Sequence, residues 1–148
     1  TLVTPPHFRN PAMLAKQVAT IDNIAGGRVI MGLGAGWFQP EFEAYGNPFP
    51  SLGQRMGALD EAVQIMKGMW SEEKTSLDGK HFQVKDALCE PKPPRRPPIL
   101  IGGTGEKVLM GLVARHADIW NNMAVFQAQL PSPLCHDLCK VQIPIYEF

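Results

Sequence analysis

The residues best suited to bind a ligand form a glycine-rich turn, Gly102-Gly103-Thr104-Gly105, which follows the apolar run 99–101. The first N–H groups of a helix have no intrahelical partner and carry a partial positive charge that suits a phosphate. Glycine lets such an anion lie against the main chain, and the Thr104 hydroxyl can donate a hydrogen bond. We interpret this turn as a phosphate site. The alternative is an ordinary strand-to-helix turn in which Thr104 only caps the helix.

A second glycine-rich turn contains Gly32, Gly34 and Gly36 and is followed by Trp37 and Phe38. Ligands of parallel α/β folds bind at the carboxyl ends of strands, so the two turns are expected to share one site. This turn is not a dinucleotide fingerprint, because that motif needs a helix at the third glycine and an acidic residue about 20 positions later. The two aromatic residues either offer flat surface to a ring system or form a buried pair under the loop that follows.

Reactive side chains in a recognisable arrangement are missing from the sequence. It contains no serine elbow, no Walker motif and no paired histidine ligands. Cys135, His136 and Cys139 have loosely metal-like spacing, but no fourth ligand follows at a known distance, so we predict no metal site. We therefore assign no catalytic residue. A bound cofactor often carries the chemistry in such proteins.

Composition narrows the class of protein. The 148 residues predict one domain, and 14 basic against 14 acidic residues give no basic face for nucleic acid or an anionic membrane. No apolar run approaches the roughly 20 residues of a membrane span, and no signal peptide opens the chain. Three cysteines, an odd number, favour reduced thiols in a cytoplasmic protein.

The elements that would hold the first turn are clear in the sequence. Residues 2–4 are typical of the end of a strand, and Asn10-Pro11 is typical of a helix start. An apolar stripe with spacings of three and four predicts a helix that ends at Gly26-Gly27. A buried strand is expected at 29–33 and a long loop at 38–51, so that the next helix starts well after Gly36. The strongest helix is predicted from Leu52 to Trp70.

The second half repeats the same design. Asp78-Gly79 predicts a hairpin turn, and five prolines within 91–98 predict a stiff extended connector. A strand at 99–101, a helix capped by Thr104 and a strand from Asp118 follow. The pattern decays after Asn122, so we divide the chain into an α/β domain at 1–122 and a tail of uncertain structure at 123–148.

Several motifs resemble the luciferase-like monooxygenase superfamily in order and spacing. The branch most similar uses the deazaflavin coenzyme F420, with FMN users as neighbours. The resemblance covers roughly residues 1 to 122, and the segments that carry it are the run 11–37, Glu41-x-x-x-Tyr45-Gly46, Arg55-x-x-x-Leu59-x-Glu61, Pro98-Ile99-Leu100-Ile101-Gly102-Gly103 and Ala117-Asp118-Ile119-Trp120-Asn121.

The resemblance implies a (β/α)8 TIM barrel with the cofactor at the carboxyl face of the strands. It implies an oxidoreductase that passes a hydride between F420 and a small organic substrate, or, with FMN, a monooxygenase. Residues 1–4 would end the strand that carries a backbone bulge behind the flavin ring in this family. Two sets of residues would bind the cofactor: Ala35, Gly36 and Trp37 beside the ring or its side chain, and Gly102, Gly103 and Thr104 at the phosphate.

The chain also departs from this family. A full barrel needs about 250 residues, so this chain would hold about strands three to six, and we expect a fragment or a truncated product. Ile119 stands where the family usually has glycine, and the tail does not resemble the family. Open strand edges invite pairing with another chain, so we expect either a homodimer that covers these edges or a chain that is marginally stable alone. A non-catalytic cofactor-binding protein and an inactive fragment are the alternatives to an enzyme.

Overall fold

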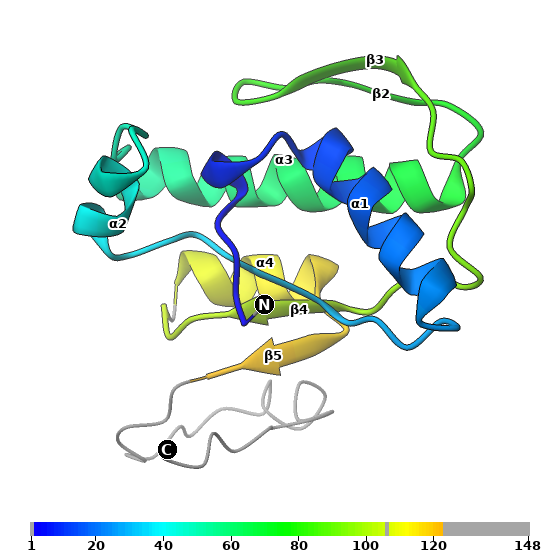
Figure 1. Ribbon diagram of the computed structural model, residues 1–148. Coiled ribbons are helices and arrows are strands. Elements are labelled where there is room, and N and C mark those ends of the chain that lie inside the picture. The colour runs from blue at the N-terminus through cyan, green and yellow to red at the C-terminus, as the bar shows by residue number, and fades with distance from the viewer. Residues whose placement is uncertain (1, 106, 123–148) are drawn as a thin grey trace.

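The computed structural model describes residues 2–105 and 107–122, which form an α/β fold (Figure 1). Three parallel strands, β1 (Met31–Gly34), β4 (Ile99–Gly102) and β5 (Ile119–Asn121), lie in the order β1-β4-β5. Thr4 adds an isolated parallel bridge to Leu33 on the other side of β1, as expected for the end of a preceding strand. None of the helices in this part of the chain is both long and apolar enough to cross a bilayer.

The first helix, α1 (Pro11–Ile24), starts and ends at the predicted residues. The Asn10 side chain accepts hydrogen bonds from the N–H groups of Ala12 and Met13 at 3.0 and 3.3 Å. Gly26 and Gly27 follow the helix with φ angles of 63° and 77°, which residues with a Cβ rarely adopt. The predicted cap and the predicted stop are both confirmed.

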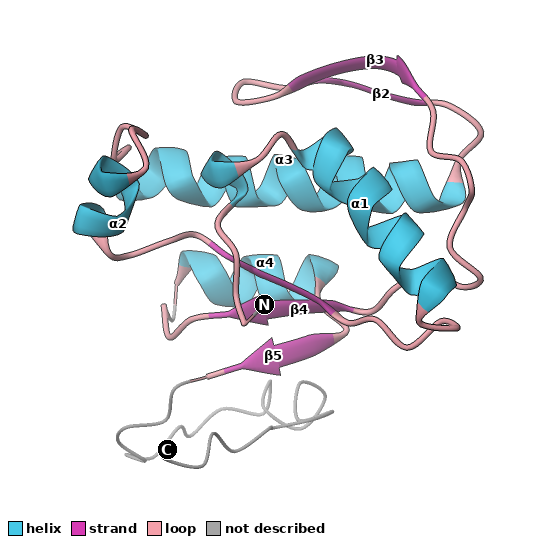
Figure 2. Cartoon of the chain, viewed as in Figure 1, coloured by secondary structure: helices cyan, strands magenta, loops and turns pink. Residues whose placement is uncertain are grey.

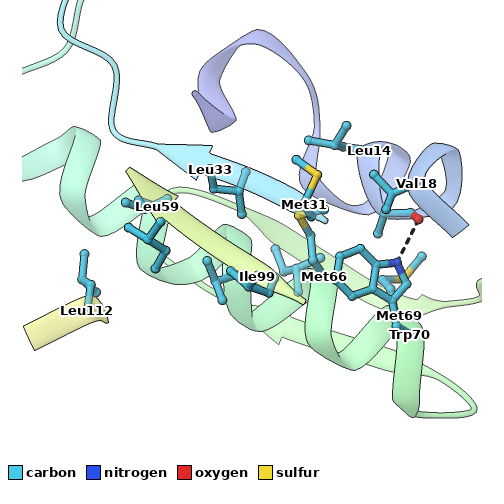
Figure 3. Packing of buried hydrophobic residues seen from close by; sticks show 14 of the residues in the cluster. Leu14, Val18, Met31, Leu33, Leu59, Met66, Met69, Trp70, Ile99 and Leu112 are labelled. Atoms are coloured by element: carbon cyan, nitrogen blue, oxygen red, sulfur yellow. Dashed lines mark hydrogen bonds between the residues drawn. The ribbon is translucent and has the colours of Figure 1, made fainter. Parts of the chain in front are cut away.

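The longest helix, α3 (Leu52–Ser71), begins with a capping box in which Ser51 and Gln54 satisfy each other's backbone N–H groups. Its apolar stripe is buried from Leu59 onward, whereas Leu52 at its start is 59% exposed. The indole of Trp70 donates to the carbonyl of Ala15 in α1 at 3.0 Å (Figure 3). This bond ties the carboxyl end of α3 to α1. The predicted helix is confirmed, and it forms the centre of the core.

The core lies on one face of the sheet. Leu33, Ile99 and Ile101 are fully buried against residues of α1, α3 and α4 (Val108–His116), and Figure 3 shows Leu33 and Ile99 beside Leu59 and Met66. Because side chains alternate along a strand, the residues between them project from the opposite face. That second face therefore carries the glycines of both turns, Gly34 and Gly102.

A hairpin of β2 (Thr75–Asp78) and β3 (Gln83–Ala87) follows α3, as the Asp78-Gly79 turn predicted (Figure 2). In Figure 1, α3 lies between this hairpin and the three-stranded sheet. The Glu61 carboxylate accepts hydrogen bonds from the N–H groups of Lys80, His81 and Phe82 at 2.8–2.9 Å. One side chain of α3 thus holds the turn of the hairpin.

The proline-rich connector is held at both ends before it enters β4. The Arg95 Nε donates to the Gly27 carbonyl at 2.6 Å, and the Asn23 amide donates to the Lys92 carbonyl at 2.9 Å. Arg96 then forms a two-pronged ion pair with Asp118, whose Oδ2 also accepts the Ile99 N–H at 2.8 Å. These bonds fix where β4 starts relative to β5.

The prediction of a long loop at 38–51 was wrong in part. The segment 38–51 is not all loop, because a short helix, α2 (Gln39–Ala44), begins three residues after Gly36. Its Phe42 is fully buried against other aromatic rings. This burial stabilises a helix that the apolar spacing and capping residues of the segment do not predict. A short 3₁₀ turn, η1 (Pro6–Phe8), carries one of those rings, that of Phe8.

Thr104 does not cap the helix after β4. The helix α4 begins at Val108, its N-cap position is Lys107, and no side chain caps it. Gly103 is held by bonds to β5, and Leu109 packs on the position where a Gly103 side chain would stand. These contacts hold Gly103 against β5 and Leu109. The helix begins five residues after Gly103, at Val108.

Candidate functional site

The candidate site is a row of three residues at the carboxyl edge of the sheet. Gly34 pairs in register with Gly102, and Gly102 pairs with Asn121. Register partners in a parallel sheet project to the same side, so these residues share the face that the helices do not cover. The sequence prediction that the two glycine turns meet is confirmed. Asn121, the third member, was not among the predicted site residues.

Val3 forms an apolar floor beside the two glycines. A Cβ built on Gly34 would lie 2.6 Å from Cγ2 of Val3, and one on Gly102 would lie 3.0 Å from its Cγ1. The segment is fixed to β1, since the Thr4 N–H donates to the Gly32 carbonyl at 3.1 Å and the Gly34 N–H to the Thr4 carbonyl at 3.2 Å. Val3, Gly34 and Gly102 together form an apolar surface on which the only side chain is the short one of Val3.

Gly36 is needed for packing inside the protein. Its φ is +80°, and a Cβ there would lie 2.7 Å from Cζ of Phe42 and 3.2 Å from Cβ of Pro5. Its predecessor Ala35 is buried at 7% exposure. Since Phe42 already occupies that side of Gly36, a ligand would approach this turn from the other residues, above all Trp37.

Trp37 and Phe38 are exposed, at 78% and 47% of their surface, with ring centroids 5.2 Å apart. The alternative that they form a buried pair is therefore wrong. Two tilted aromatic rings in solvent directly after β1 offer flat apolar surface at the edge that carries Gly34 and Gly102.

In the second turn, both backbone hydrogen-bonding groups of Gly103 are already paired within the protein. Its N–H donates to the Asn121 carbonyl, and its carbonyl accepts the indole N–H of Trp120, both at 3.0 Å. Gly103 also has φ +141°, and a Cβ there would lie 2.6 Å from Leu109. Thr104 and Gly105 are exposed, so they are the residues of this turn that a ligand can reach from solvent.

Beside this turn, an open cavity of about 540 Å³ lies between α3 and α4, with Gly105 and Lys107 in its wall. The opposite wall is the first half of α3, including Met56 and Asp60. Asp60 is paired with His116 at 2.6 Å and lies 3.5 Å from Arg115, so the charges of this wall are largely balanced.

Asn121 is 6% exposed, yet its Nδ2 has no hydrogen-bond partner in the part of the chain that the structure describes. Asn122, the next residue, has a buried Oδ1 in the same condition. Buried amides are almost always hydrogen-bonded, so an unpaired one at the carboxyl edge of a parallel sheet calls for an explanation. The sequence signal that could have found it is a polar residue within the strand predicted from Asp118.

A group of aromatic and basic side chains supports the loop after β1. The ring centroid of Phe42 lies 4.7 Å from that of Phe8 and 5.1 Å from that of Phe49, and the Arg55 guanidinium lies 4.0 Å above the Phe49 ring. Burial, and then the charges of His81 and Arg55, lower the pKa of His7. His7 is thus neutral near neutral pH and acts here as part of the packing.

The described residues contain no cluster of His, Cys, Asp or Glu that could hold a metal ion. The candidate ligands Cys135, His136 and Cys139 lie outside the described residues, as does the whole of the predicted tail. Cys89 is a buried free thiol, and burial raises its pKa.

Comparison of the sequence with those of known proteins shows which family this chain resembles. Residues 1–128 match the family model of luciferase-like monooxygenases. The chain is 34% identical over 110 residues to the FMNH2-dependent dimethylsulfone monooxygenase of Pseudomonas putida, covering 74% of the chain and 30% of that protein. It is 35% identical over 108 residues to the F420-dependent glucose-6-phosphate dehydrogenase of Kineococcus radiotolerans, covering 73% and 32%.

Among solved structures, an F420-dependent secondary alcohol dehydrogenase in complex with an F420-acetone adduct is similar, with a TM-score of 0.74 and 30% identity. That match covers 82% of this chain and 37% of the dehydrogenase, so the chain spans about a third of each of these three proteins. The parallel sheet therefore corresponds to part of the luciferase-like barrel fold. The chain belongs to the luciferase-like monooxygenase family.

Proposed function

We propose that this chain forms part of the cofactor site of an oxidoreductase that passes a hydride between F420 and a small organic substrate. The observation that carries the proposal is the row Gly34, Gly102 and Asn121, in which two residues without side chains adjoin a buried, unpaired amide. Similarity to an F420-dependent dehydrogenase and to an F420-dependent alcohol dehydrogenase structure supports this cofactor.

The residues present fit a flat heterocyclic ring. Such a ring has two apolar faces and a polar edge with carbonyl and N–H groups. Val3 with the two glycines gives an apolar floor, Trp37 gives exposed aromatic surface, and Asn121 gives a donor. Contact with these groups would orient the ring and exclude water from one of its faces. When bound, the cofactor itself supplies the redox chemistry.

The phosphate of the cofactor would bind at the turn after β4. The exposed Thr104 supplies a hydroxyl and an N–H, while Gly102 and Gly103 shape the turn by leaving room for Val3 and Leu109 to pack against it. The Gly103 peptide is already bonded to β5, so its part in the proposal is to shape the turn. Ala35 and Gly36 would similarly fix the direction in which Trp37 leaves β1.

The alternative is FMN in the same site, which would make the whole protein a monooxygenase. The similarity to an FMNH2-dependent dimethylsulfone monooxygenase supports it. Both cofactors share a tricyclic ring and a phosphate on a short chain, so the floor, the aromatic surface and the phosphate turn serve either. The choice between them depends on which one the chain binds more tightly.

A fluorescence titration of the purified chain with F420 and FMN in parallel tests the proposal. Saturable binding in the micromolar range, about 8 kcal/mol, would support a site formed by these residues. Binding of neither cofactor would overturn the proposal for this chain, and tighter binding of FMN would favour the monooxygenase.

A second titration locates the phosphate. Riboflavin has the ring of FMN without its phosphate, so the ratio of the two affinities measures the phosphate contribution. Thr104→Val keeps the shape of the side chain and removes the hydroxyl, so it should bring the FMN and riboflavin affinities closer together. Thr20→Val is the matched control, because the Thr20 hydroxyl bonds only to the Lys16 carbonyl on the exposed side of α1. An unchanged ratio in Thr104→Val would contradict the phosphate assignment.

A further inference from the structure

Asn121 stands apart from the other buried polar side chains because of where it lies. Six buried side-chain polar atoms lack partners among the described residues: Nδ2 of Asn121, Oδ1 of its neighbour Asn122, Nδ1 of His7 in η1, and one atom each of Asp22 in α1, Arg55 in α3 and Thr75 in the hairpin. The Nδ2 of Asn121 lies at the end of β5, in register with both glycine turns. Among these atoms it is the amide donor of a residue that pairs in register with the glycine row.

Among the described residues, no group accepts a hydrogen bond from the Asn121 amide. Its register partner Gly102 has no side chain, and the space in front of Gly102 is taken by the methyl groups of Val3. The backbone of Asn121 is fixed, because its carbonyl accepts the Gly103 N–H at 3.0 Å. The amide is thus held in place by the ladder while its N–H groups stay unpaired.

An unpaired buried amide destabilises the folded protein, so its presence calls for a reason. Residues that lower stability at a binding site are commonly those that meet the ligand. We propose that the Asn121 side chain donates a hydrogen bond to a carbonyl on the polar edge of the cofactor's ring, and so sets the position of the ring on the Val3 floor. This inference rests on the proposed function.

Removing the amide tests this role, because binding and stability should change in opposite directions. Asn121→Leu is close to isosteric and Asn121→Ala avoids any crowding against Val3, so at least one of the pair should fold. We expect either variant to bind both FMN and riboflavin about tenfold more weakly than the unmodified chain, since each loses one hydrogen bond to the ring. The melting temperature of the unliganded chain should stay the same or rise, because an unsatisfied buried donor is gone.

Asn23→Leu is the matched control. The Asn23 amide is fully engaged, donating to the carbonyls of Ala19 and Lys92 at 2.9 Å each, and it lies at the far end of α1. This variant should lower the melting temperature and leave the affinity for both flavins unchanged. The two asparagine substitutions should therefore give opposite patterns.

Each remaining result overturns the inference in a distinguishable way. Unchanged flavin affinity in both Asn121 variants would show that the amide does not meet the ring. A lower melting temperature of the unliganded variants would show a structural role. Weaker binding of FMN with unchanged binding of riboflavin would place the amide at the phosphate. If the unmodified chain binds neither F420 nor FMN, the proposed function itself fails. That titration uses the unmodified chain and not the Asn121 variants, so the two failures can be told apart.

Discussion

Gly34 and Gly102 are register partners at the carboxyl ends of β1 and β4, and one side chain, that of Val3, contacts both where a Cβ would stand. Three segments far apart in the sequence therefore meet at one point of the sheet. Valine is stiff about χ1, so its methyl groups cannot easily move away from a new neighbour. The two glycines are thus required by packing as well as by the proposed approach of a ligand.

Gly34→Ala should destabilise the chain by about 1–3 kcal/mol, because the added methyl group would overlap Cγ2 of Val3 at 2.6 Å. Gly102→Ala should cost less, because its closest contact to Val3 is 3.0 Å. Adding Val3→Ala should recover much of the loss in the Gly34 variant, since the overlapping atoms are removed. Urea unfolding of the single and double variants measures all three.

Gly53→Ala is the control for this series. Gly53 lies in the first turn of α3 with no atom within 4 Å of an added Cβ, so the same substitution should stabilise the chain by up to about 1 kcal/mol. If Val3→Ala gives no recovery in the Gly34 variant, the strain lies elsewhere than in the Val3 contact.

Local signals predicted most of the elements, because caps and apolar spacing act over a few residues. Asn10, Gly26 and the stripe of α3 are examples in which the structure has the predicted feature at the predicted position. The short helix α2 was missed because its stability comes from the burial of Phe42 among distant rings. The start of α4 was placed too early because contacts of Gly103 with β5 and Leu109 override the capping tendency of Thr104.

The site could be predicted only in part for the same physical reason. Glycine turns after apolar strands are visible in one sequence, and their meeting follows from parallel pairing. The floor formed by Val3 and the unpaired state of Asn121 depend on register across three strands, which spacing along the chain does not reveal. The cofactor roles of Ala35, Gly36, Trp37, Gly102, Gly103 and Thr104, and a second copy at the open edge, stay predictions.

Glu61 should be the main attachment of the β2–β3 hairpin to α3. Glu61→Gln keeps the size of the side chain but loses charge and one acceptor, so it should destabilise the chain by about 2 kcal/mol. The amides of residues 80–82 should also exchange faster with deuterium, because their carboxylate acceptor is gone. Glu73→Gln, an exposed site after α3, is the matched control. Unchanged exchange at 80–82 would show that the strands alone hold the hairpin.

Asp118 should make stability depend on pH in the acid range. Burial alone would raise its pKa, but hydrogen bonds from Arg96 and from the Ile99 N–H outweigh burial and hold the pKa below its ordinary value. A lowered carboxyl pKa stabilises the fold above the pKa of the unfolded chain, and this contribution is lost as pH falls through the folded value.

Asp118→Asn removes the titration and keeps an oxygen that can accept the Ile99 N–H. Its free energy of unfolding should be lower than that of the unmodified chain at about pH 7, and the gap should narrow toward about pH 3, below the ordinary Asp pKa. Arg96→Gln should reproduce the loss near neutral pH, because it removes the partner of the same ion pair. A gap that is constant over this range would exclude the carboxylate charge as its cause.

Trp37 should affect cofactor binding and leave stability nearly unchanged. The side chain is 78% exposed and packs only on Phe38 among the aromatic rings of the described residues, so Trp37→Ala should change the free energy of unfolding by no more than about 0.5 kcal/mol. Loss of a stacked ring should weaken FMN and F420 binding about three- to tenfold. Tyr45→Ala, at 69% exposure directly after α2, is the control and should bind both cofactors normally. Equal affinities of the Trp37 variant and the unmodified chain, measured by cofactor fluorescence, would place the ring away from Trp37 and leave the Val3 floor as its contact.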